Sequence, residues 1–225
     1  MKQYAISDIH GCAKTFKALL EQISFSKEDV LYLLGDYVDR GPDSKGVIDH
    51  IWQLQSEGYT VFCLKGNHEQ LMIDSLVNWE KRRSWLTYGG LETIESFAVQ
   101  TLEEIPEVYI VWLKNLPHFL EIEGYLLVHA GLNFELKNPL EDETAMLWIR
   151  RWYGSIDKTW LDGRIIVHGH TPTKQLLIQN SLHNLEDIPA IDIDAGCVFD
   201  ILGLGRLCAL DLDSRALYFE SNIDR

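Results

Sequence analysis

Five short apolar stretches of the sequence end in the same way, in an Asp, Asn or His close to a glycine. The central stretch, from Val30 to Leu34, leads directly into Gly35-Asp36. A short apolar run with β-branched and aromatic members, closed by glycine, predicts a buried strand. The other four stretches lead into Ser7-Asp8-Ile9-His10-Gly11, Gly66-Asn67-His68, His129-Ala130-Gly131 and His168-Gly169-His170. Because open α/β sheets bind ligands at the carboxyl ends of their strands, this recurrence predicts one shared site.

The first 80 or so residues alternate between predicted strands and predicted helices. Strands are expected at about Lys2 to Ile6, Val30 to Leu34 and Thr60 to Leu64, and a helix from Glu69 to about Trp79. Two further helices are indicated by apolar residues at helical spacing. These residues are Phe16, Leu19, Leu20 and Ile23 in one helix, and Val47, Ile48, Ile51 and Leu54 in the next. The order βαβαβα predicts parallel strands joined by right-handed crossovers.

Residues from about 78 to 117 have a different pattern. A charged run, Glu80 to Arg83, and the turn signal Gly89-Gly90 are followed by helical patterns from Leu91 to Phe97 and after Pro106. We expect a single domain over residues 1–225 that carries a helical insertion at about 78–117. The inserted helices either cover a sheet face or form a lid that selects the substrate.

The second half of the chain is predicted to be rich in strands. The expected strands are Phe119 to Ile122, Tyr125 to Val128, Arg164 to Val167, Gln175 to Ile178, Ala190 to Ile193, Leu207 to Leu212 and Ala216 to Phe219. Together with the first half, this number of strands fits an α/β fold of two packed mixed β-sheets flanked by helices.

The net charge of the chain limits its partners. A formal charge of −14 argues against long nucleic acids and anionic membranes, whose binding depends on Lys and Arg. It does not argue against a small anionic substrate, because bound metal ions can dominate the local field. No apolar run approaches the ~20 residues of a membrane span, and the first strand begins too early for a signal peptide. The four cysteines show no C-x-x-C spacing and are expected to be buried free thiols in a protein of the reducing cytoplasm.

The polar residues at the strand ends have the chemistry of metal ligands. The candidates are Asp8, His10, Asp36, Asn67, His129 and His170. Only two of them are carboxylates, so two divalent cations bound here would leave a positively charged cluster suited to phosphate. Asp36, on the central strand, is the natural bridging ligand for two ions ~3.5–4 Å apart that activate a water molecule. Mixed nitrogen and oxygen ligands suit Mn, Fe, Zn or Co better than Ca or hydrated Mg.

Three residues next to these ligands predict how a phosphate ester would be cleaved. His68, adjacent to Asn67, is the candidate general acid for the leaving group. Asp39 is placed to hold His68 in its protonated form. Arg40 offers a fork of donors for phosphate oxygens.

The ordered motifs resemble those of the metallophosphoesterases, and most closely the bacterial and phage phosphoprotein phosphatases. The motifs are Ser7-Asp8-Ile9-His10-Gly11, Gly35-Asp36-Tyr37-Val38-Asp39-Arg40-Gly41, Gly66-Asn67-His68-Glu69, His129-Ala130-Gly131 and His168-Gly169-His170-Thr171. The resemblance covers roughly residues 4 to 200. It implies an αββα sandwich of the metallophosphatase type and two divalent ions, first of all Mn²⁺, with Fe, Zn, Co or Mg as alternatives.

The resemblance also assigns roles to individual residues. It implies that Asp8, His10 and Asp36 bind the first metal ion. The second ion is assigned to Asp36, Asn67, His129 and His170. Asp39 and His68 match the acid pair, and phosphate binding is assigned to Arg40 and Asn67. The segment Leu147 to Arg150 resembles the one that supplies a second phosphate-binding arginine, which makes Arg150 a candidate and leaves Arg151 beside it as the alternative.

Two departures from the family pattern are visible. Ser7 stands where these phosphatases usually have Gly, a change that touches no ligand. After His170 comes Thr171-Pro172, so the additional histidine ligand of other metallophosphoesterase branches is absent. This absence favours the phosphoprotein-phosphatase branch.

Three functions compete. The first is a metal-dependent phosphomonoester hydrolase, a serine/threonine or dual-specificity protein phosphatase, acting on phosphoproteins or small phosphate esters. The second is a symmetrical dinucleoside-tetraphosphate hydrolase; these relatives commonly show Ala at the position of Asp39 and Asp at that of Glu69, so both residues favour the phosphatase. The third is a catalytically silent scaffold, which the complete ligand set disfavours. The sequence carries no signal for an oligomeric state.

Overall fold

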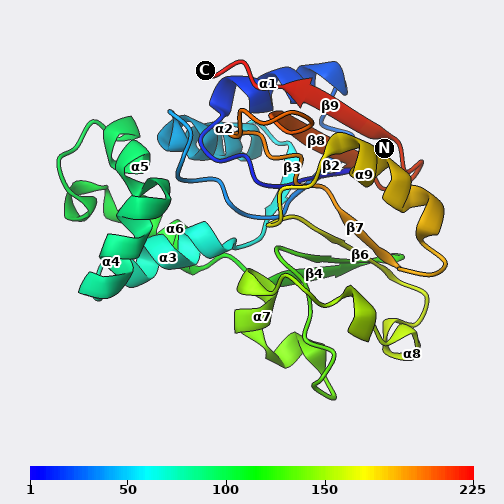
Figure 1. Cartoon of the computed structure of the whole chain (residues 1–225). Coiled ribbons are helices and arrows are strands. Elements are labelled where there is room, and N and C mark those ends of the chain that lie inside the picture. The colour runs from blue at the N-terminus through cyan, green and yellow to red at the C-terminus, as the bar shows by residue number, and fades with distance from the viewer.

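The computed structural model describes all 225 residues, which fold around two packed β-sheets (Figure 1). The first sheet consists of β1 (Gln3–Ile6), β2 (Val30–Leu33), β3 (Thr60–Cys63), β8 (Arg206–Asp211) and β9 (Leu217–Ser221). The second consists of β4 (Phe119–Ile122), β5 (Tyr125–Val128), β6 (Ile165–His168) and β7 (Ala190–Asp192). Their strand orders are β3-β2-β1-β8-β9 and β4-β5-β6-β7. Each sheet contains parallel and antiparallel pairs, so the prediction of two mixed sheets is confirmed.

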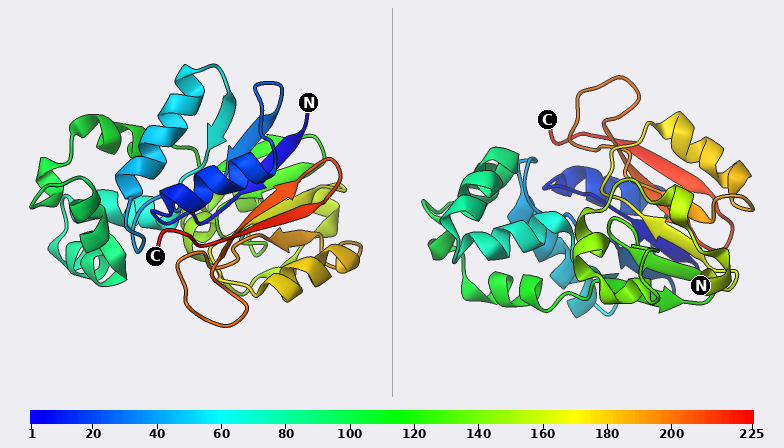
Figure 2. Two further views of the ribbon diagram at one scale, coloured as in Figure 1. Left: turned by 90° about the horizontal axis from the view of Figure 1, so that it is seen from above. Right: turned by 60° about the horizontal axis from the view of Figure 1, so that its bottom comes forward.

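Helices lie on the outer sides of the two sheets (Figure 2). The α-helices are α1 (Ala13–Gln22), α2 (Ser44–Ser56), α3 (Asn67–Ser75), α4 (Trp79–Trp85), α5 (Leu91–Ser96), α6 (Glu107–Lys114), α7 (Glu143–Trp148), α8 (Lys158–Leu161) and α9 (Gln175–Ser181). A π-helical turn, η1, spans Leu86–Gly90, and 3₁₀ turns are η2 (Leu102–Glu104), η3 (Pro139–Glu141), η4 (Tyr153–Ser155) and η5 (Leu182–Asn184).

The layers follow from the alternation of apolar side chains along each strand, because neighbouring residues of a strand point to opposite faces. In β2, Leu31 and Leu33 pack with the buried faces of α1 and α2. Tyr32, between them, points into the space between the sheets, where it joins one apolar cluster with Leu127 of β5 and Val167 of β6. Strands buried on both faces read as continuous apolar runs, which is why the sequence revealed them so clearly.

Residues 79–114 lie between β3 and β4 in sequence and form a helical segment that contains α4, η1, α5, η2 and α6. Figure 1 shows these elements gathered with α3 on one side of the sheet pair. Two of their aromatic residues pack against α2 and the loop after β2. Tyr109 stacks on Trp52 of α2 with ring centroids 4.6 Å apart, and Trp112 lies against Tyr37 of the loop at 5.6 Å.

The predicted strand at Gln175 to Ile178 is wrong, because these residues begin helix α9. The amides of Leu177 and Ile178 both bond to the carbonyl of Lys174, as at the start of a helix. Ile178 is buried while Leu176 is exposed. A run of three apolar residues fits the period of a strand and that of a helix equally well, so the pattern could not decide between them.

Two expectations about the whole chain can be checked directly. All four cysteines are buried and unpaired, as predicted. None of the helices has the length and apolar character that crossing a membrane requires.

Candidate metal centre

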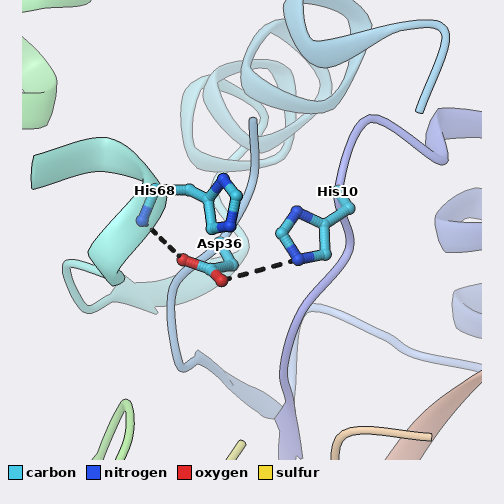
Figure 3. A group of neighbouring side chains, drawn as sticks. All are labelled: His10, Asp36 and His68. Carbon is cyan, nitrogen blue, oxygen red and sulfur yellow. Dashed lines mark hydrogen bonds and ion pairs between the residues drawn. The ribbon is translucent and has the colours of Figure 1, made fainter. Parts of the chain in front are cut away.

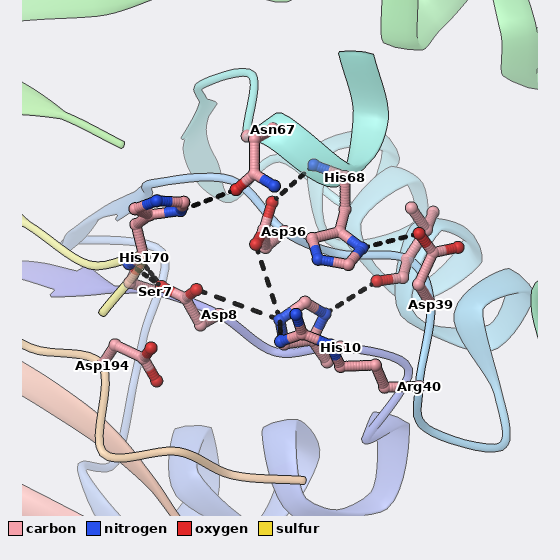
Figure 4. Close-up of polar contacts among 12 residues, drawn as sticks. Ser7, Asp8, His10, Asp36, Asp39, Arg40, Asn67, His68, His170 and Asp194 are labelled. Atoms are coloured by element: carbon pink, nitrogen blue, oxygen red, sulfur yellow. Dashed lines mark hydrogen bonds and ion pairs between the residues drawn. The ribbon is translucent and has the colours of Figure 1, made fainter. Parts of the chain in front are cut away.

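The six predicted ligands lie together, at the carboxyl ends of strands from both sheets. Figure 4 labels all of them except His129. Asp8 and His10 follow β1, Asp36 follows β2, and Asn67 opens α3 directly after β3. The second sheet contributes His129 after β5 and His170 after β6. All six side chains are buried.

Asp36 occupies the centre of this group. Its Oδ2 atom lies 3.5 Å from Nε2 of His10, and its Oδ1 atom lies 3.5 Å from Nε2 of His129. Oδ1 also accepts a hydrogen bond from the backbone amide of His68 at 3.0 Å (Figure 3). The two carboxylate oxygens therefore face different imidazoles, which is the arrangement that a bridging ligand needs.

The ligand atoms form two clusters that share Asp36. One consists of His10, Asp36 and His68, and the other of Asp36, His129 and His170; within each, the ligand atoms lie within 4.8 Å of one another. The first cluster differs from the set implied by the family resemblance, since it contains His68 in place of Asp8.

Asp8 and Asn67 lie at the edges of these clusters. Oδ1 of Asp8 is 4.0 Å from Nε2 of His10, while its Oδ2 accepts hydrogen bonds from the Ser7 hydroxyl and, at 3.0 Å, from the His170 amide. The side-chain oxygen of Asn67 is 2.9 Å from Nε2 of His129 and 2.7 Å from Nδ1 of His170.

The imidazoles are oriented as metal ligands are. Nδ1 of His10 lies 2.9 Å from the carbonyl oxygen of Val38, and Nδ1 of His129 lies 2.9 Å from that of Leu34. A proton held on Nδ1 by a carbonyl leaves Nε2 with its lone pair directed into the site. Nε2 of His170 is buried and has no hydrogen-bond partner, which is costly unless another group satisfies it.

The electrostatics of the group also fit divalent cations. Burial and the neighbouring Asp8 raise the pKa of Asp36 well above its usual value. Burial lowers the pKa of His10 and of His129, which keeps these rings neutral. Neutral imidazoles beside carboxylates are the donor set that mixed-ligand transition-metal sites use. The residues therefore fit a pair of divalent ions.

Several of these residues have a backbone conformation that only the surrounding structure can maintain. Asp8, His10, Asp36 and His170 have φ angles of 55°, 46°, 56° and 72°. Positive φ is uncommon for residues other than glycine, and such residues concentrate at functional sites. Gly35 precedes Asp36 because a Cβ atom there would lie 2.4 Å from the amide of Gly66.

The carboxylate of Glu69 fixes the loop that carries Asp36. Its Oε2 accepts hydrogen bonds from the amides of Asp36 and Gly66, both at 2.8 Å. Its Oε1 accepts from the amides of Tyr37 at 2.7 Å and Val38 at 3.3 Å. Glu69 is fully buried, and burial raises its pKa to about 7 although the four amides act in the opposite direction. The sequence pattern around Glu69 indicated only a substrate class and did not predict this role.

Asp39 and His68 form a buried pair beside the first cluster. Oδ2 of Asp39 is 2.7 Å from Nδ1 of His68, and the His68 ring meets that of His10 edge-on with centroids 4.7 Å apart. Burial raises the pKa of Asp39 to about 8 and lowers that of His68. At this separation the Asp39 carboxylate opposes the effect of burial on the imidazole.

Two residues from the helical segment hold Asp39 in place. The indole Nε1 of Trp85 donates to both oxygens of the Asp39 carboxylate, at 2.9 and 3.0 Å, and the Thr93 hydroxyl donates to Oδ1 at 2.7 Å. These contacts were not predicted from the sequence. The only available signal was a tryptophan at the end of a charged run, just before Gly89-Gly90.

The two candidate phosphate-binding arginines lie on different sides of the group. Nη1 of Arg40 is 2.8 Å from Nε2 of His10, and Figure 4 shows this side chain at the His10 edge of the site. Nη1 of Arg150 donates to the carbonyl of His170 at 3.3 Å and to the hydroxyl of Thr171 at 3.2 Å. Arg151 makes neither contact, so Arg150 is the arginine that reaches the site.

Comparison with known proteins points to one family. The family model described as calcineurin-like phosphoesterase matches residues 1–195. A symmetrical bis(5'-nucleosyl)-tetraphosphatase of Pseudomonas putida is 28% identical over 178 residues, 71% of this chain and 57% of that protein. The asymmetrical bis(5'-nucleosyl)-tetraphosphatase PrpE of Bacillus cereus is 27% identical over an alignment of 245 positions, which covers 93% of this chain and 90% of that protein. The chain thus spans about half the length of its symmetrical relatives.

Solved structures share the fold. A putative diadenosine tetraphosphatase superposes with a TM-score of 0.65 at 23% identity, covering 97% of this chain and 92% of that one. A serine/threonine phosphatase from Saccharomyces cerevisiae superposes with a TM-score of 0.70 at 15% identity, covering 100% and 81%. The predicted metallophosphatase-type sandwich is confirmed.

The bonds of Glu69 lead to a first prediction. Glu69→Gln replaces an oxygen with an amide group that cannot accept from the loop amides. We expect the free energy of unfolding to fall by at least about 2 kcal/mol, since buried donors lose a charged acceptor. Urea unfolding in the presence of a chelator measures this independently of metal binding. Glu28→Gln, at an exposed position, is the control and should change stability by less than about 0.5 kcal/mol. Equal stability of the two variants would contradict the role of Glu69.

Proposed function

The chain belongs to the calcineurin-like phosphoesterase family of hydrolases, and we propose that it cleaves phosphate esters and anhydrides at a dinuclear metal centre. The observation that carries this proposal is Asp36, whose two oxygens face the ligand groups of two clusters. Ions bound there would supply Lewis-acid polarisation of the phosphoryl group and activation of water.

We assign the ligands in two sets. Asp8, His10 and Asp36 hold the first ion. Asp36, Asn67, His129 and His170 would hold the second. Mn²⁺ is our first choice because the set mixes imidazole nitrogen with carboxylate and amide oxygen, and Fe, Zn, Co or Mg are the alternatives.

The remaining residues act on the substrate. Arg40 and Arg150 approach from the His10 and His170 sides and bind the non-bridging phosphate oxygens, with Asn67 between them as a further contact. His68 would donate a proton from Nε2 to the leaving oxygen while its Nδ1 stays bonded to Asp39. Trp85 and Thr93 keep the Asp39 carboxylate turned toward His68.

The first candidate substrate is a bis(5'-nucleosyl) tetraphosphate. This class is named for the relatives that match over most of this chain, one of which is covered almost from end to end. The comparisons therefore favour the dinucleotide over the phosphoprotein substrate that the sequence analysis placed first. Because the two named relatives differ in the bond they cleave, both products need to be measured.

The second candidate is a phosphomonoester such as phosphoserine or phosphothreonine in a protein. The 2.7 Å contact between Asp39 and His68 favours it. An alkoxide leaving group needs a proton, and a positioned acid contributes ~10²–10⁴-fold to such a reaction. A nucleotide leaves as an already acidic phosphate and gains less from this pair.

A substrate panel with added Mn²⁺ distinguishes the candidates. We expect diadenosine tetraphosphate to show a higher kcat/KM than phosphopeptides or aryl phosphates, and a chelator to abolish all turnover. Two molecules of ADP would identify symmetrical cleavage, and ATP with AMP asymmetrical cleavage. Faster turnover of phosphopeptides would replace the first candidate by the second.

The role of His68 can be tested with leaving groups of different acidity. In His68→Asn we expect kcat on alkyl phosphates to fall ~10²–10⁴-fold and kcat on p-nitrophenyl phosphate to fall much less, because nitrophenolate needs no proton. Metal content, measured by elemental analysis, should be unchanged, and the exposed His183→Asn is the matched control. Loss of one metal ion per chain would instead make His68 a ligand, as its place in the first cluster allows.

A further inference from the structure

A cavity of about 490 Å³ opens beside Arg40, between the helical segment and the loop that precedes β8. Tyr88, Leu86 and Leu91 line it from η1 and α5, and Phe199 lines it from the loop. Its volume falls within the ~300–1,000 Å³ that small-molecule sites occupy. None of the candidate metal ligands lines the cavity, so it is separate from the candidate metal centre and adjoins it at Arg40.

The side chains of the helical segment that line this cavity are unusually exposed for apolar residues. Tyr88 is 56% exposed, Leu91 53% and Leu86 39%. Clustered apolar side chains in contact with water mark binding surfaces more often than isolated ones do. Here the cluster surrounds a hollow of ligand size, so burial of a planar apolar group is favourable.

Residues on two sides of the cavity contact Arg40, the proposed phosphate-binding arginine. The amide of Arg40 donates to the carbonyl of Gly89 at 3.1 Å, and a Cβ atom on Gly89 would lie 2.4 Å from that amide. On the other side, the guanidinium carbon of Arg40 lies 5.5 Å from the centre of the Phe199 ring. The Arg40 guanidinium and the Phe199 ring therefore lie side by side at the edge of the cavity.

A ligand that contacts both the Arg40 guanidinium and the aromatic side chains of the cavity has a phosphate next to a flat aromatic ring. We infer that the cavity binds the base of a nucleotide substrate, with Tyr88 and Phe199 as the stacking residues and Arg40 on the adjoining phosphate. Glu92 adds a negative charge to the wall, which disfavours a second phosphate inside the cavity. This inference rests on the proposed action on dinucleotides and names the part of the protein that would recognise them.

Two ligands that differ only in the base test the inference. AMP and ribose 5-phosphate share the sugar and the phosphate, and calorimetry on the Mn²⁺-loaded protein gives a dissociation constant for each. We expect AMP to bind roughly 5- to 100-fold more tightly, the range of one stacked base. Tyr88→Leu and Phe199→Leu, which keep apolar bulk without the ring, should each reduce that ratio at least about threefold.

The controls separate this inference from the proposed function. Trp79→Leu, which removes a 67% exposed aromatic residue outside the cavity, should leave the ratio as it is. Equal binding of AMP and ribose 5-phosphate, or a ratio that survives both substitutions in the cavity, would overturn the inference. The binding ratio is measured without turnover. Failure of the protein to cleave any dinucleotide would therefore contradict the proposed function, while the binding ratio would still test the base-binding cavity.

Discussion

The site depends on a buried carboxylate that holds a loop by its backbone. Glu69 accepts hydrogen bonds from four amides, three of them in the consecutive residues Asp36, Tyr37 and Val38. The Tyr37 hydroxyl adds bonds to the carbonyls of Leu33 and Leu64, at the ends of β2 and β3. This network places Asp36 between the two imidazole groups and compensates for its strained φ angle. The candidate metal centre therefore depends on the hydrogen bonds that fix this loop, because they set the position of Asp36.

The same loop links the metal centre to the helical segment. Three residues after Asp36, the Asp39 carboxylate contacts His68 and accepts hydrogen bonds from Trp85 and Thr93. One residue further, Arg40 bonds through its amide to Gly89. Residues 79–114, which lie between β3 and β4 in sequence, thus contact the proposed acid pair, the proposed phosphate-binding Arg40 and the cavity beside it. The helical segment therefore holds residues to which we assign roles in the proposed reaction.

The strand ends could be predicted from the sequence because two independent local signals coincide there. Apolar runs buried on both faces mark strands such as β2 and β5, and the Asp or His that closes each run has no other reason to follow a buried strand. What the sequence could not show were contacts between distant elements, such as Trp85 to Asp39 or Glu69 to the Asp36 loop. The helix at Gln175–Ser181 was mistaken for a strand because its apolar run is too short to have a period. The phosphoprotein substrate was placed first on two residues, Asp39 and Glu69, which the structure shows to have positional roles.

Anomalous diffraction from crystals soaked in Mn²⁺ tests the central claim most directly, that strand ends of two sheets bring six side chains around a pair of ions. We predict two anomalous peaks about 3.5–4 Å apart, both in contact with the Asp36 carboxylate, the spacing of two-metal hydrolases. A single peak, or two peaks of which only one touches Asp36, would contradict the dinuclear centre proposed for this protein.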